Sequence, residues 1–243
     1  MDHRELYAAL AAGVPAGETI AAAAQGARWA LAETERGSGL AMFTAGHSRP
    51  ALFPTGLAGL DVRKAAEAVA GWNLEEAGQA LAAVNAACNR FDRAEALGAR
   101  VGGHYADGIE LTGKTVALIG HMKGPAGLRE QAKEVCILER EPKEGDFPDA
   151  ACDWILPRCD LVIITGSSLV NKTLPHLLSL CERATVILTG PSVPLCPALL
   201  DFGIDRVSGL IVTDREGLRR RVETGEHGSP FVHGQPFTLC REK

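Results

Sequence analysis

The sequence lacks any uninterrupted apolar run long enough to cross a bilayer, so we predict no membrane-spanning helix and no membrane partner. It also lacks a patch of lysine and arginine apart from Arg219-Arg220-Arg221, and its formal net charge is −5. These two features argue against nucleic acid as a partner, and we expect the arginine triplet to form a solvated helix face. Residues 1–5 are largely charged and lack the apolar core of a signal peptide, which favours a cytoplasmic protein.

No Cys-x-x-Cys pair occurs among the seven cysteines, whose number is odd. We therefore expect no disulfide framework in a chain of this size. Cys136 and Cys181 fall in apolar periodic runs and are expected to be small buried side chains. Cys196 differs because it lies in a glycine-containing loop. Two interpretations of Cys196 remain open, namely a buried residue at a helix start and a metal ligand.

Nucleotide-binding motifs are missing or broken. No Walker-type glycine loop is present, and Gly120, Gly124 and Gly127 give Gly-x-x-x-Gly-x-x-Gly in place of the dinucleotide fingerprint. Glu139 nevertheless ends a strand predicted over residues 135–140, at the place where a dinucleotide-binding domain keeps its ribose-binding carboxylate. The alternative is an ordinary glutamate at a strand end, which is common.

The chain is organised around residues 160–197. A β-branched run at 161–164 ends in a polar loop at 165–168, and leucines at helical spacing follow, with Thr173 as the expected helix cap. A second apolar run at 185–188 ends in the loop 189–194, and Pro197 opens a short helix that Gly203 ends. This alternation predicts a βαβ unit in a parallel sheet.

The two loops are the main indication of function. Ligands of open parallel sheets bind outside the carboxyl ends of the strands, where both loops are expected to lie side by side. Glycine permits close approach of the backbone, and Ser167, Ser168, Thr189 and Ser192 add hydroxyl groups. The alternative is that these residues simply form turns and caps. Two such loops after consecutive strands favour a binding crevice.

The remaining patterns predict an α/β chain of two domains. Residues 1–97 form an α+β domain, with strands at 20–25, 27–34 and 40–44 as a three-stranded antiparallel meander, and with helices at 3–12, 61–70 and 73–89. A capping box of Asn73 and Glu76 opens the last helix.

Residues 98–113 are a linker in which 104–107 either line a ligand site or lie on the surface. Residues 114–243 form a Rossmann-like parallel domain with further strands at 115–120 and 207–212. We expect Gly209 to mark a bulge or a close backbone approach, and the apolar residues of 231–239 to dock the tail on the core.

Several stretches carry a resemblance to a known family: 116–121, 137–140, 164–171 with 173–174, 190–195 and 207–214, and more weakly 78–85. They resemble the bacterial and archaeal family named "putative heavy-metal chelation domain". The resemblance implies a Rossmann-like C-terminal half, an N-terminal half like the enolase N-terminal domain, and a site between the two. The chain departs from the family pattern at Cys196, where we expect serine, and at Lys172, where we expect glycine.

Three hypotheses of function follow. The first is binding of a small anionic ligand or a transition-metal complex in an interdomain cleft walled by both halves. The second is an enzyme acting on a nucleotide-like or other small anionic substrate, with His121 as acid or base because its pKa is near neutral. The third is an interaction or assembly protein that has kept the fold without catalysing a reaction. Whether the protein forms a homodimer is left open by the sequence.

The ligand-binding residues predicted for the first hypothesis belong to the strand ends and the loops after them: Gly120, His121, Glu139, Thr165, Gly166, Ser167, Ser168, Asn171, Thr173, Gly190, Pro191, Ser192 and Asp214. If the strands at 115–120 and 185–188 are neighbours, His121 and Cys196 lie close together. Imidazole and thiolate are suited to a transition metal, Ni, Co, Zn or Fe, rather than to Mg or Ca.

Overall fold

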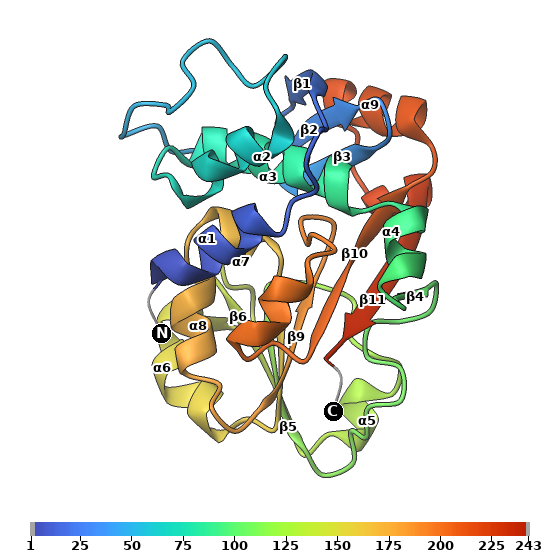
Figure 1. The fold of residues 1–243 in the computed structure, drawn as a ribbon. Helices are drawn as coiled ribbons and strands as arrows, with labels where there is room; N and C mark the ends of the chain where they lie inside the picture. Colours follow the sequence, from blue (N-terminus) through green and yellow to red (C-terminus); the bar gives the residue numbers. More distant parts are fainter. Residues whose placement is uncertain (1–2, 242–243) are drawn as a thin grey trace.

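The computed structural model describes residues 3–241, coloured along the chain in Figure 1. In this part of the chain the α-helices are α1 (His3–Ala12), α2 (Val62–Ala65), α3 (Leu74–Cys88), α4 (Phe91–Ala96), α5 (Leu128–Gln131), α6 (Cys152–Ile155), α7 (Ser167–Val170), α8 (Leu174–Ser179) and α9 (Arg215–Thr224). The 3₁₀ helices are η1 (Ala66–Ala70), η2 (Asp149–Ala151), η3 (Leu156–Arg158), η4 (Pro197–Phe202) and η5 (Pro230–His233). The strands are β1 (Ile20–Gln25), β2 (Trp29–Thr34), β3 (Ser38–Met42), β4 (Arg100–Val101), β5 (Thr115–Ile119), β6 (Glu134–Glu139), β7 (Phe147–Pro148), β8 (Leu161–Thr165), β9 (Thr185–Thr189), β10 (Arg206–Val212) and β11 (Gly234–Cys240).

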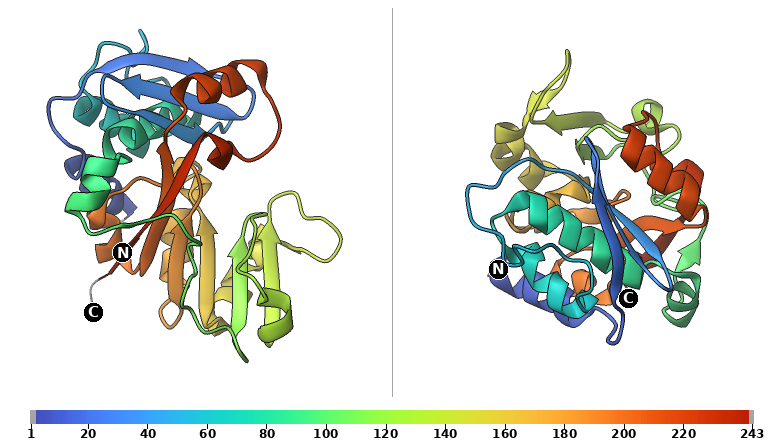
Figure 2. Two further views of the ribbon diagram at one scale, coloured as in Figure 1. Left: turned by 90° about the vertical axis from the view of Figure 1, so that its right-hand side faces the viewer. Right: turned by 90° about the horizontal axis from the view of Figure 1, so that it is seen from above.

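These strands form two sheets within residues 3–241. The smaller sheet has the order β1-β2-β3 and is antiparallel throughout. The larger sheet has the order β4-β11-β10-β9-β8-β5-β6-β7 and is mostly parallel. The left view of Figure 2 shows the small sheet at the top, α3 beneath it and the large sheet below. The predicted fold class, a mixed α/β chain with an antiparallel meander ahead of a parallel sheet, is confirmed.

The small sheet packs closely on α3 because a glycine lies at their contact. A Cβ atom at Gly39 would lie 2.2 Å from both the Ala82 carbonyl oxygen and the Ala86 nitrogen, so no larger residue fits between β3 and α3. The alanine-rich face of α3 presents equally small side chains to the sheet. The predicted meander is confirmed, although β3 begins at Ser38, two residues before the predicted start.

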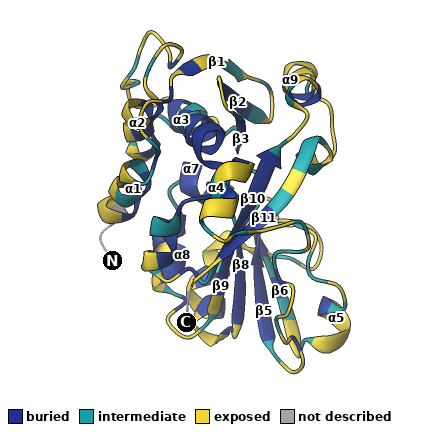
Figure 3. Ribbon diagram, turned by 45° about the vertical axis from the view of Figure 1, so that its right-hand side comes forward, coloured by how far each residue is buried: buried dark blue, intermediate teal, exposed yellow. Residues whose placement is uncertain are grey.

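The parallel strands are buried on both faces, as their apolar runs require. Residues 161–164 of β8 are fully buried, and Figure 3 shows the central strands as the dark interior of the C-terminal half. Gly209 in β10 marks a close approach, because a Cβ atom there would lie 2.4 Å from the Val193 carbonyl oxygen. The pairing of β10 with β11 has no register shift at Gly209. Of the two predicted alternatives, the structure therefore contains the close backbone contact and not the bulge.

The C-terminal tail docks on the core as a strand, since Phe237 and Leu239 are buried in a hydrophobic cluster as predicted, whereas Val232 is 70% exposed. β11 pairs antiparallel with β10 along seven residues, and β4, which comes from the predicted linker, pairs antiparallel with β11. The predicted parallel sheet comprises β5, β6, β7, β8, β9 and β10, and the antiparallel strands β11 and β4 extend it at one edge. Pro236 and Gly234 weakened the strand pattern of the tail, since both residues are unfavourable in strands.

Of two predicted helix caps, Asn73 caps its helix and Thr173 does not. Asn73 caps α3, since its Oδ1 accepts a hydrogen bond from the Glu76 N–H at 3.0 Å. The Glu76 carboxylate does not return to Asn73 but accepts from the N–H groups of Leu52 and Phe53, at 2.8 and 2.7 Å. Thr173 stands at the start of α8 without a side-chain cap, because its hydroxyl donates to Asn171 Oδ1 at 2.6 Å.

The N-terminal half covers the carboxyl ends of β9 and β10. Asn89, at the end of α3, donates to the carbonyls of Val193 and Leu210 at 2.9 and 3.2 Å and accepts from the Leu195 N–H at 2.6 Å. One hydrophobic cluster contains buried residues from both halves, among them Leu81 and Leu188. The two halves therefore share a continuous core.

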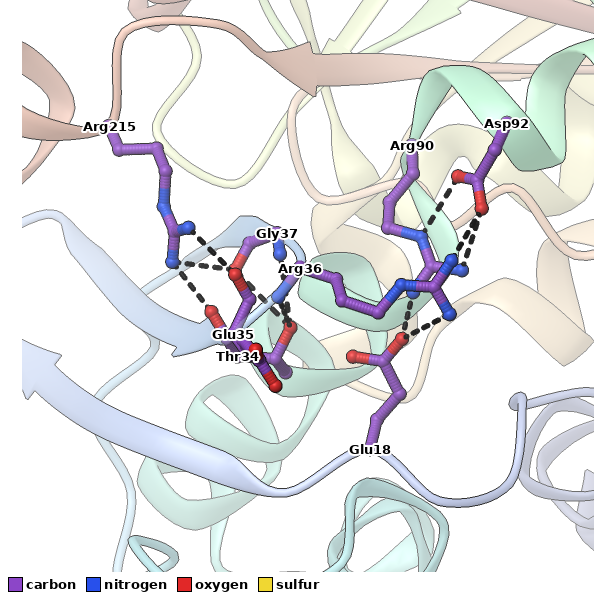
Figure 4. Close-up of polar contacts among 8 residues, drawn as sticks. All are labelled: Glu18, Thr34, Glu35, Arg36, Gly37, Arg90, Asp92 and Arg215. Atoms are coloured by element: carbon purple, nitrogen blue, oxygen red, sulfur yellow. Dashed lines mark hydrogen bonds and ion pairs between the residues drawn. The ribbon is translucent and has the colours of Figure 1, made fainter.

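Charged side chains form a network in and around the N-terminal half (Figure 4). Glu18, whose side chain is 4% exposed, pairs with Arg90 and lies 3.6 Å from Arg36, and both arginines also contact Asp92. Arg215 of α9 donates to backbone carbonyls of the β2–β3 turn, including that of Thr34 at 2.6 Å. This network joins the start of β1, that turn and α4.

The arginine triplet of α9 is not a fully solvated face, as the sequence had suggested. Arg221 is 6% exposed and donates to His233 Nε2 at 3.0 Å and to the His227 carbonyl at 2.9 Å. Arg219 pairs with Glu33 of β2, and Arg220 is exposed. The chain folds back after α9 and covers Arg221, which helical periodicity alone cannot reveal. Within residues 3–241, the helices are all too short or too polar to cross a membrane.

Candidate functional site

The two polar loops lie side by side at the carboxyl edge of the large sheet, as predicted. β8 and β9 are paired neighbours with Thr165 opposite Thr189, and the Gly166 N–H donates to the Thr189 carbonyl at 2.8 Å. β5 lies on the other side of β8, so Gly120 also meets Thr165. Gly120 has φ +101°, and a Cβ atom there would approach the Thr165 side chain to 3.2 Å. Glycine is required at this position by its conformation and by the space available.

A cavity of about 300 Å³ opens at the ends of β5, β6 and β8. This volume is at the lower end of the range of small-molecule sites. The lining residues come from the strand ends, from η2 and α6, and from α7 and α8: Ile119, Gly120, Leu138, Glu139, Arg140, Asp149, Ala150, Cys152, Asp153, Thr165, Ser167, Ser168, Asn171, Thr173, His176 and Leu177. All of them lie between positions 119 and 177. This cavity is therefore not walled by both halves, contrary to our expectation.

The first polar loop supplies hydroxyl and amide groups to the cavity. Thr165 Oγ1 and Ser167 Oγ are 3.2 Å apart, and both side chains are partly exposed. Ser168 is 1% exposed and donates to the Thr165 carbonyl at 2.7 Å, so it stabilises the turn. Asn171 Oδ1 accepts from the Thr173 N–H and hydroxyl at 3.1 and 2.6 Å. Within the described residues the Asn171 NH₂ group makes no hydrogen bond, which leaves it available to a ligand.

The charged lining is mainly acidic. The lining contains three carboxylate residues, Glu139, Asp149 and Asp153, and one guanidinium, that of Arg140. Arg140 Nε lies 3.7 Å from Asp149, and His176 Nε2 lies 3.3 Å from Asp153. Glu139 is held in place because its two oxygens accept from the N–H groups of His121 and Arg140, at 2.6 and 3.2 Å. An acidic lining favours a cationic ligand over an anionic one.

The donor set of the cavity fits a metal only in part. Carboxylate and imidazole are both ligands of transition metals, and Asp153 with His176 is a pair at suitable separation. Among residues 3–241, however, no group of three or more His, Cys, Asp or Glu side chains is arranged to hold a metal ion. A metal bound by the Asp153–His176 pair would therefore need its remaining ligands from water or from an organic chelator.

His121 lies at the margin of this site. Its Nε2 is 2.6 Å from Asp146 Oδ2, and Asp146 also accepts from the Lys143 N–H at 2.8 Å. The Lys143 N–H first, and then His121, lower the pKa of Asp146. Hence Asp146 is a stable anionic partner for the imidazole. The pair fastens the loop after β6 to the end of β5, and the cavity wall contains Ile119 and Gly120 but not His121 itself.

The second polar loop is used in the contact between the two halves. Ser192 is 2% exposed, and its Oγ accepts from the Met42 N–H at 2.8 Å. The Pro191 carbonyl accepts from Asn85 Nδ2 at 3.5 Å. Gly166 packs beneath this loop, since a Cβ atom there would lie 2.6 Å from the Val193 side chain. The structure therefore does not bring Gly190, Pro191, Ser192 or Gly166 into the wall of the cavity.

Asp214 and Cys196 lie away from the cavity wall. Asp214 caps α9 by accepting from the Gly217 N–H at 2.8 Å, and its other oxygen is 2.8 Å from His233 Nδ1. Cys196 is fully buried in the core, and a Cβ atom at Gly13 would lie 2.6 Å from its sulfur. Burial raises the pKa of the Cys196 thiol, which opposes thiolate formation.

The strand arrangement that would join His121 to Cys196 was predicted wrongly. β8 lies between β5 and β9, so the loops that follow β5 and β9 are not direct neighbours. The prediction depended on the first and fourth strands being neighbours, as in most doubly wound sheets, but the order of this sheet places the third strand, β8, between them. The structure accordingly gives no support to a shared site of His121 and Cys196.

A second cavity, of about 320 Å³, adjoins the first at Asn171. Its other lining residues come from the loop after β3 and from the start of α3: Gly46, Ser48, Arg49, Trp72 and Leu74. The N-terminal half thus contributes to the site through this neighbouring cavity. His104, in the predicted linker, packs its ring against Tyr105 at 4.0 Å between centroids, and the Tyr105 hydroxyl donates to the Lys123 carbonyl at 2.7 Å.

Comparison with known families identifies the chain. A model described as "Putative heavy-metal chelation" matches residues 108–238, more than half of the sequence, and a second model with the same description matches residues 7–88. The chain belongs to the DUF364 family. The first cavity lies wholly within the part that the DUF364 model matches.

Solved structures agree with this membership. A DUF364 protein of unknown function from Desulfitobacterium hafniense is 34% identical, with a TM-score of 0.84 and 98% of each chain covered. A second DUF364 protein of unknown function, from Pyrococcus horikoshii, is 20% identical with a TM-score of 0.74 and the same coverage, and it shares the fold. An uncharacterised protein of Methanocaldococcus jannaschii is 30% identical over 108 residues, and the match spans 42% of this chain and 42% of that relative's length.

The sequence patterns of this DUF364 protein did not indicate four ionisable residues of the cavity: Arg140, Asp149, Asp153 and His176. Asp149 and Asp153 are four residues apart, the spacing at which side chains of one helix face lie together, and they stand in the successive short helices η2 and α6. His176 stands in the first turn of the helix that follows the polar loop. Both signals were present, but their significance depends on how α6 and α8 pack against the strand ends.

Proposed function

We propose that this protein binds a transition-metal complex in the cavity at the ends of β5, β6 and β8. The observation that carries the proposal is the acidic lining, in which His176 and Asp153 form an imidazole–carboxylate pair 3.3 Å apart. The family description, heavy-metal chelation, supports the same chemistry at the level of the family. A free anionic ligand, our initial alternative to a complex, is disfavoured by three carboxylates in the wall.

A complex suits the cavity better than a bare ion does. The described residues offer a pair of ligating side chains rather than a group of three or more, so a bare ion would keep several water ligands and bind weakly. Thr165, Ser167 and the Asn171 NH₂ group can hydrogen-bond the organic part of a complex. A cavity of about 300 Å³ has room for a small chelator as well as its metal.

We also propose that the chain divides into a domain of residues 1–97, a linker at 98–113 and a domain of residues 114–243. The small sheet with α3 is the part that we compare with the enolase N-terminal domain, and the parallel sheet is the Rossmann-like part. The cavity belongs to the second part, and the first part closes the neighbouring strand ends of β9 and β10.

The test is a binding measurement on protein purified without a histidine tag or a chelator. We would titrate Ni²⁺ alone, and Ni²⁺ with an equimolar amount of iminodiacetate, a neutral complex with open coordination positions. Binding would be followed by calorimetry, with native mass spectrometry for stoichiometry. Asp153→Asn and His176→Ala should each weaken binding of the nickel complex to the protein by about tenfold or more. A tenfold loss corresponds to about 1.4 kcal/mol of binding free energy.

His227→Ala is the matched control, because His227 is an exposed histidine that contacts Arg28 far from the cavity. We expect it to bind the nickel complex as the wild type does. Equal affinity in Asp153→Asn, His176→Ala and the wild type would refute the proposed site. Absence of binding in the wild type would refute the proposed function.

A further inference from the structure

The second cavity has the opposite charge to the first. Arg49 is its sole charged lining residue, whereas the wall of the first cavity carries three carboxylates. Within residues 3–241 the Arg49 guanidinium makes no ion pair, although most arginines discussed above contact a carboxylate or a carbonyl. An arginine without a partner at a cavity wall can bind a carboxylate through two parallel N–H groups.

Trp72 gives the second cavity an aromatic wall. Its side chain is 66% exposed, although tryptophan usually buries most of its apolar surface. It stands directly before Asn73, the residue that caps α3, and Leu74 lies beside it in the cavity lining. An exposed indole with an aliphatic neighbour is a surface on which a planar ring can stack.

The wall that carries Arg49 is fixed to the start of α3 by hydrogen bonds. The Leu74 N–H donates to the Gly46 carbonyl at 2.7 Å, and Asn73 Nδ2 donates to the Arg49 carbonyl at 3.1 Å. The buried Glu76 carboxylate accepts from two further backbone N–H groups of the same segment, those of residues 52 and 53. These bonds hold the backbone of Arg49 next to Trp72.

Asn171 connects the two cavities, since it lines both. Its Oδ1 is used by Thr173, which fixes the side chain and leaves the NH₂ group free of hydrogen bonds within the described residues. A ligand that extends across Asn171 would contact the acidic wall of the first cavity at one end. At its other end it would contact the arginine and the aromatic ring of the second cavity. The two cavities together suit a molecule with a cationic or metal-bearing end and an anionic end.

We infer that the second cavity is a subsite for an aromatic or heteroaromatic carboxylate, with its ring on Trp72 and its carboxylate on Arg49. This inference rests on the proposed function in one respect, namely that the carboxylate belongs to the organic part of the metal complex. The ring and the carboxylate are recognised independently of any metal. The subsite can therefore be tested without one.

The test uses benzoate as the probe and the tryptophan indole N–H resonances as the readout. The chain has three tryptophans, so a protein labelled with ¹⁵N-tryptophan gives a simple spectrum that Trp72→Phe and Trp154→Phe assign. Trp154 is 76% exposed and follows Asp153 of the first cavity, which makes it an internal reference. We expect benzoate to shift the Trp72 resonance saturably and to leave that of Trp154 in place.

Arg49→Ala should weaken benzoate binding at least fivefold, and Arg220→Ala, which removes an exposed arginine of α9, should not change it. Cyclohexanecarboxylate, which has the charge without the aromatic ring, should bind more weakly than benzoate. A Trp72 shift that is the same in Arg49→Ala and the wild type would overturn the inference, as would no shift at all.

Asp153→Asn separates this inference from the proposed function. It should weaken binding of the nickel complex at the first cavity by about tenfold or more but leave the benzoate shift of Trp72 unchanged. Benzoate binding without nickel binding would refute the proposed function and support the subsite. Nickel binding by wild type without a benzoate shift would refute the subsite and leave the proposed function standing.

Discussion

The backbone N–H of Met42 donates to Ser192 Oγ at 2.8 Å, across 150 positions of the sequence. This bond joins the end of β3 to the loop after β9, and it explains why two similar polar loops have different roles. The loop after β9 is covered by the N-terminal half, whereas the loop after β8 stays open to the cavity. Which loop binds a ligand is therefore decided by where the small sheet packs.

Ser192→Ala should lower the free energy of unfolding without affecting ligand binding. The substitution leaves the Met42 N–H without its acceptor in a largely buried setting, which costs about 1–3 kcal/mol. Urea unfolding followed by circular dichroism measures the change, and calorimetry with nickel iminodiacetate measures binding. A binding loss as large as that of Asp153→Asn would show instead that the second loop contacts the ligand.

Gly39→Ala should prevent the normal packing of β3 on α3. Its Cβ atom would lie 2.2 Å from backbone atoms of Ala82 and Ala86, so the strand and the helix must move apart. We expect a loss of about 3 kcal/mol or more, in line with overpacked cores. Gly71→Ala is the control, since the nearest atom there is 3.1 Å away and its φ is −69°. Similar unfolding midpoints for both variants would contradict this account of Gly39.

Glu18→Gln should destabilise the protein because it leaves the positive charge of Arg90 without its buried partner (Figure 4). The two side chains are 4% and 9% exposed, and loss of one member of a buried ion pair costs about 3–5 kcal/mol. Asp92 also contacts Arg90, at 3.1 Å and from the exposed side. This second carboxylate should bring the loss of unfolding free energy toward the lower end of that range. The control is Glu35→Gln, at an exposed residue of the neighbouring turn, and equal stability of both variants would refute the role of Glu18.

Lys172 should make stability rise with pH in the alkaline range. Burial lowers the pKa of Lys172 from about 10.5 to about 8, and its Nζ contacts the Val69 carbonyl at 2.5 Å and the Tyr7 ring at 5.1 Å. Between these two pKa values the unfolded chain holds a proton that the folded chain has lost, so the folded state gains relative stability as pH rises. The gain is on the order of 3 kcal/mol at most.

The measurement compares urea unfolding of the wild type with that of Lys172→Met at pH 7.5 and pH 9.5. The wild type should gain stability relative to Lys172→Met over this interval. Lys133→Met, which changes an exposed lysine, should show no such difference from the wild type. A constant difference between wild type and Lys172→Met at the two pH values would contradict a lowered pKa.

Sequence patterns predicted the local features of this fold and missed those that depend on distant packing. The run at 161–164 with its polar loop, the helix cap of Asn73 and the close contact at Gly209 follow from local residue types. The pairing of β11 with β10 and the burial of Arg221 do not, because each depends on a partner chosen by the tertiary fold. The acidic wall was missed for the same reason, since α6 and α8 must first meet at the strand ends.

The most direct test of the central claim is the position of a metal in a crystal of this protein. Crystals soaked with nickel iminodiacetate and measured at the nickel absorption edge give the metal position from anomalous diffraction. We predict a peak in the first cavity, within coordination distance of Asp153 and His176. A peak at the His121–Asp146 pair or beside Cys196, with none between Asp153 and His176, would contradict the account.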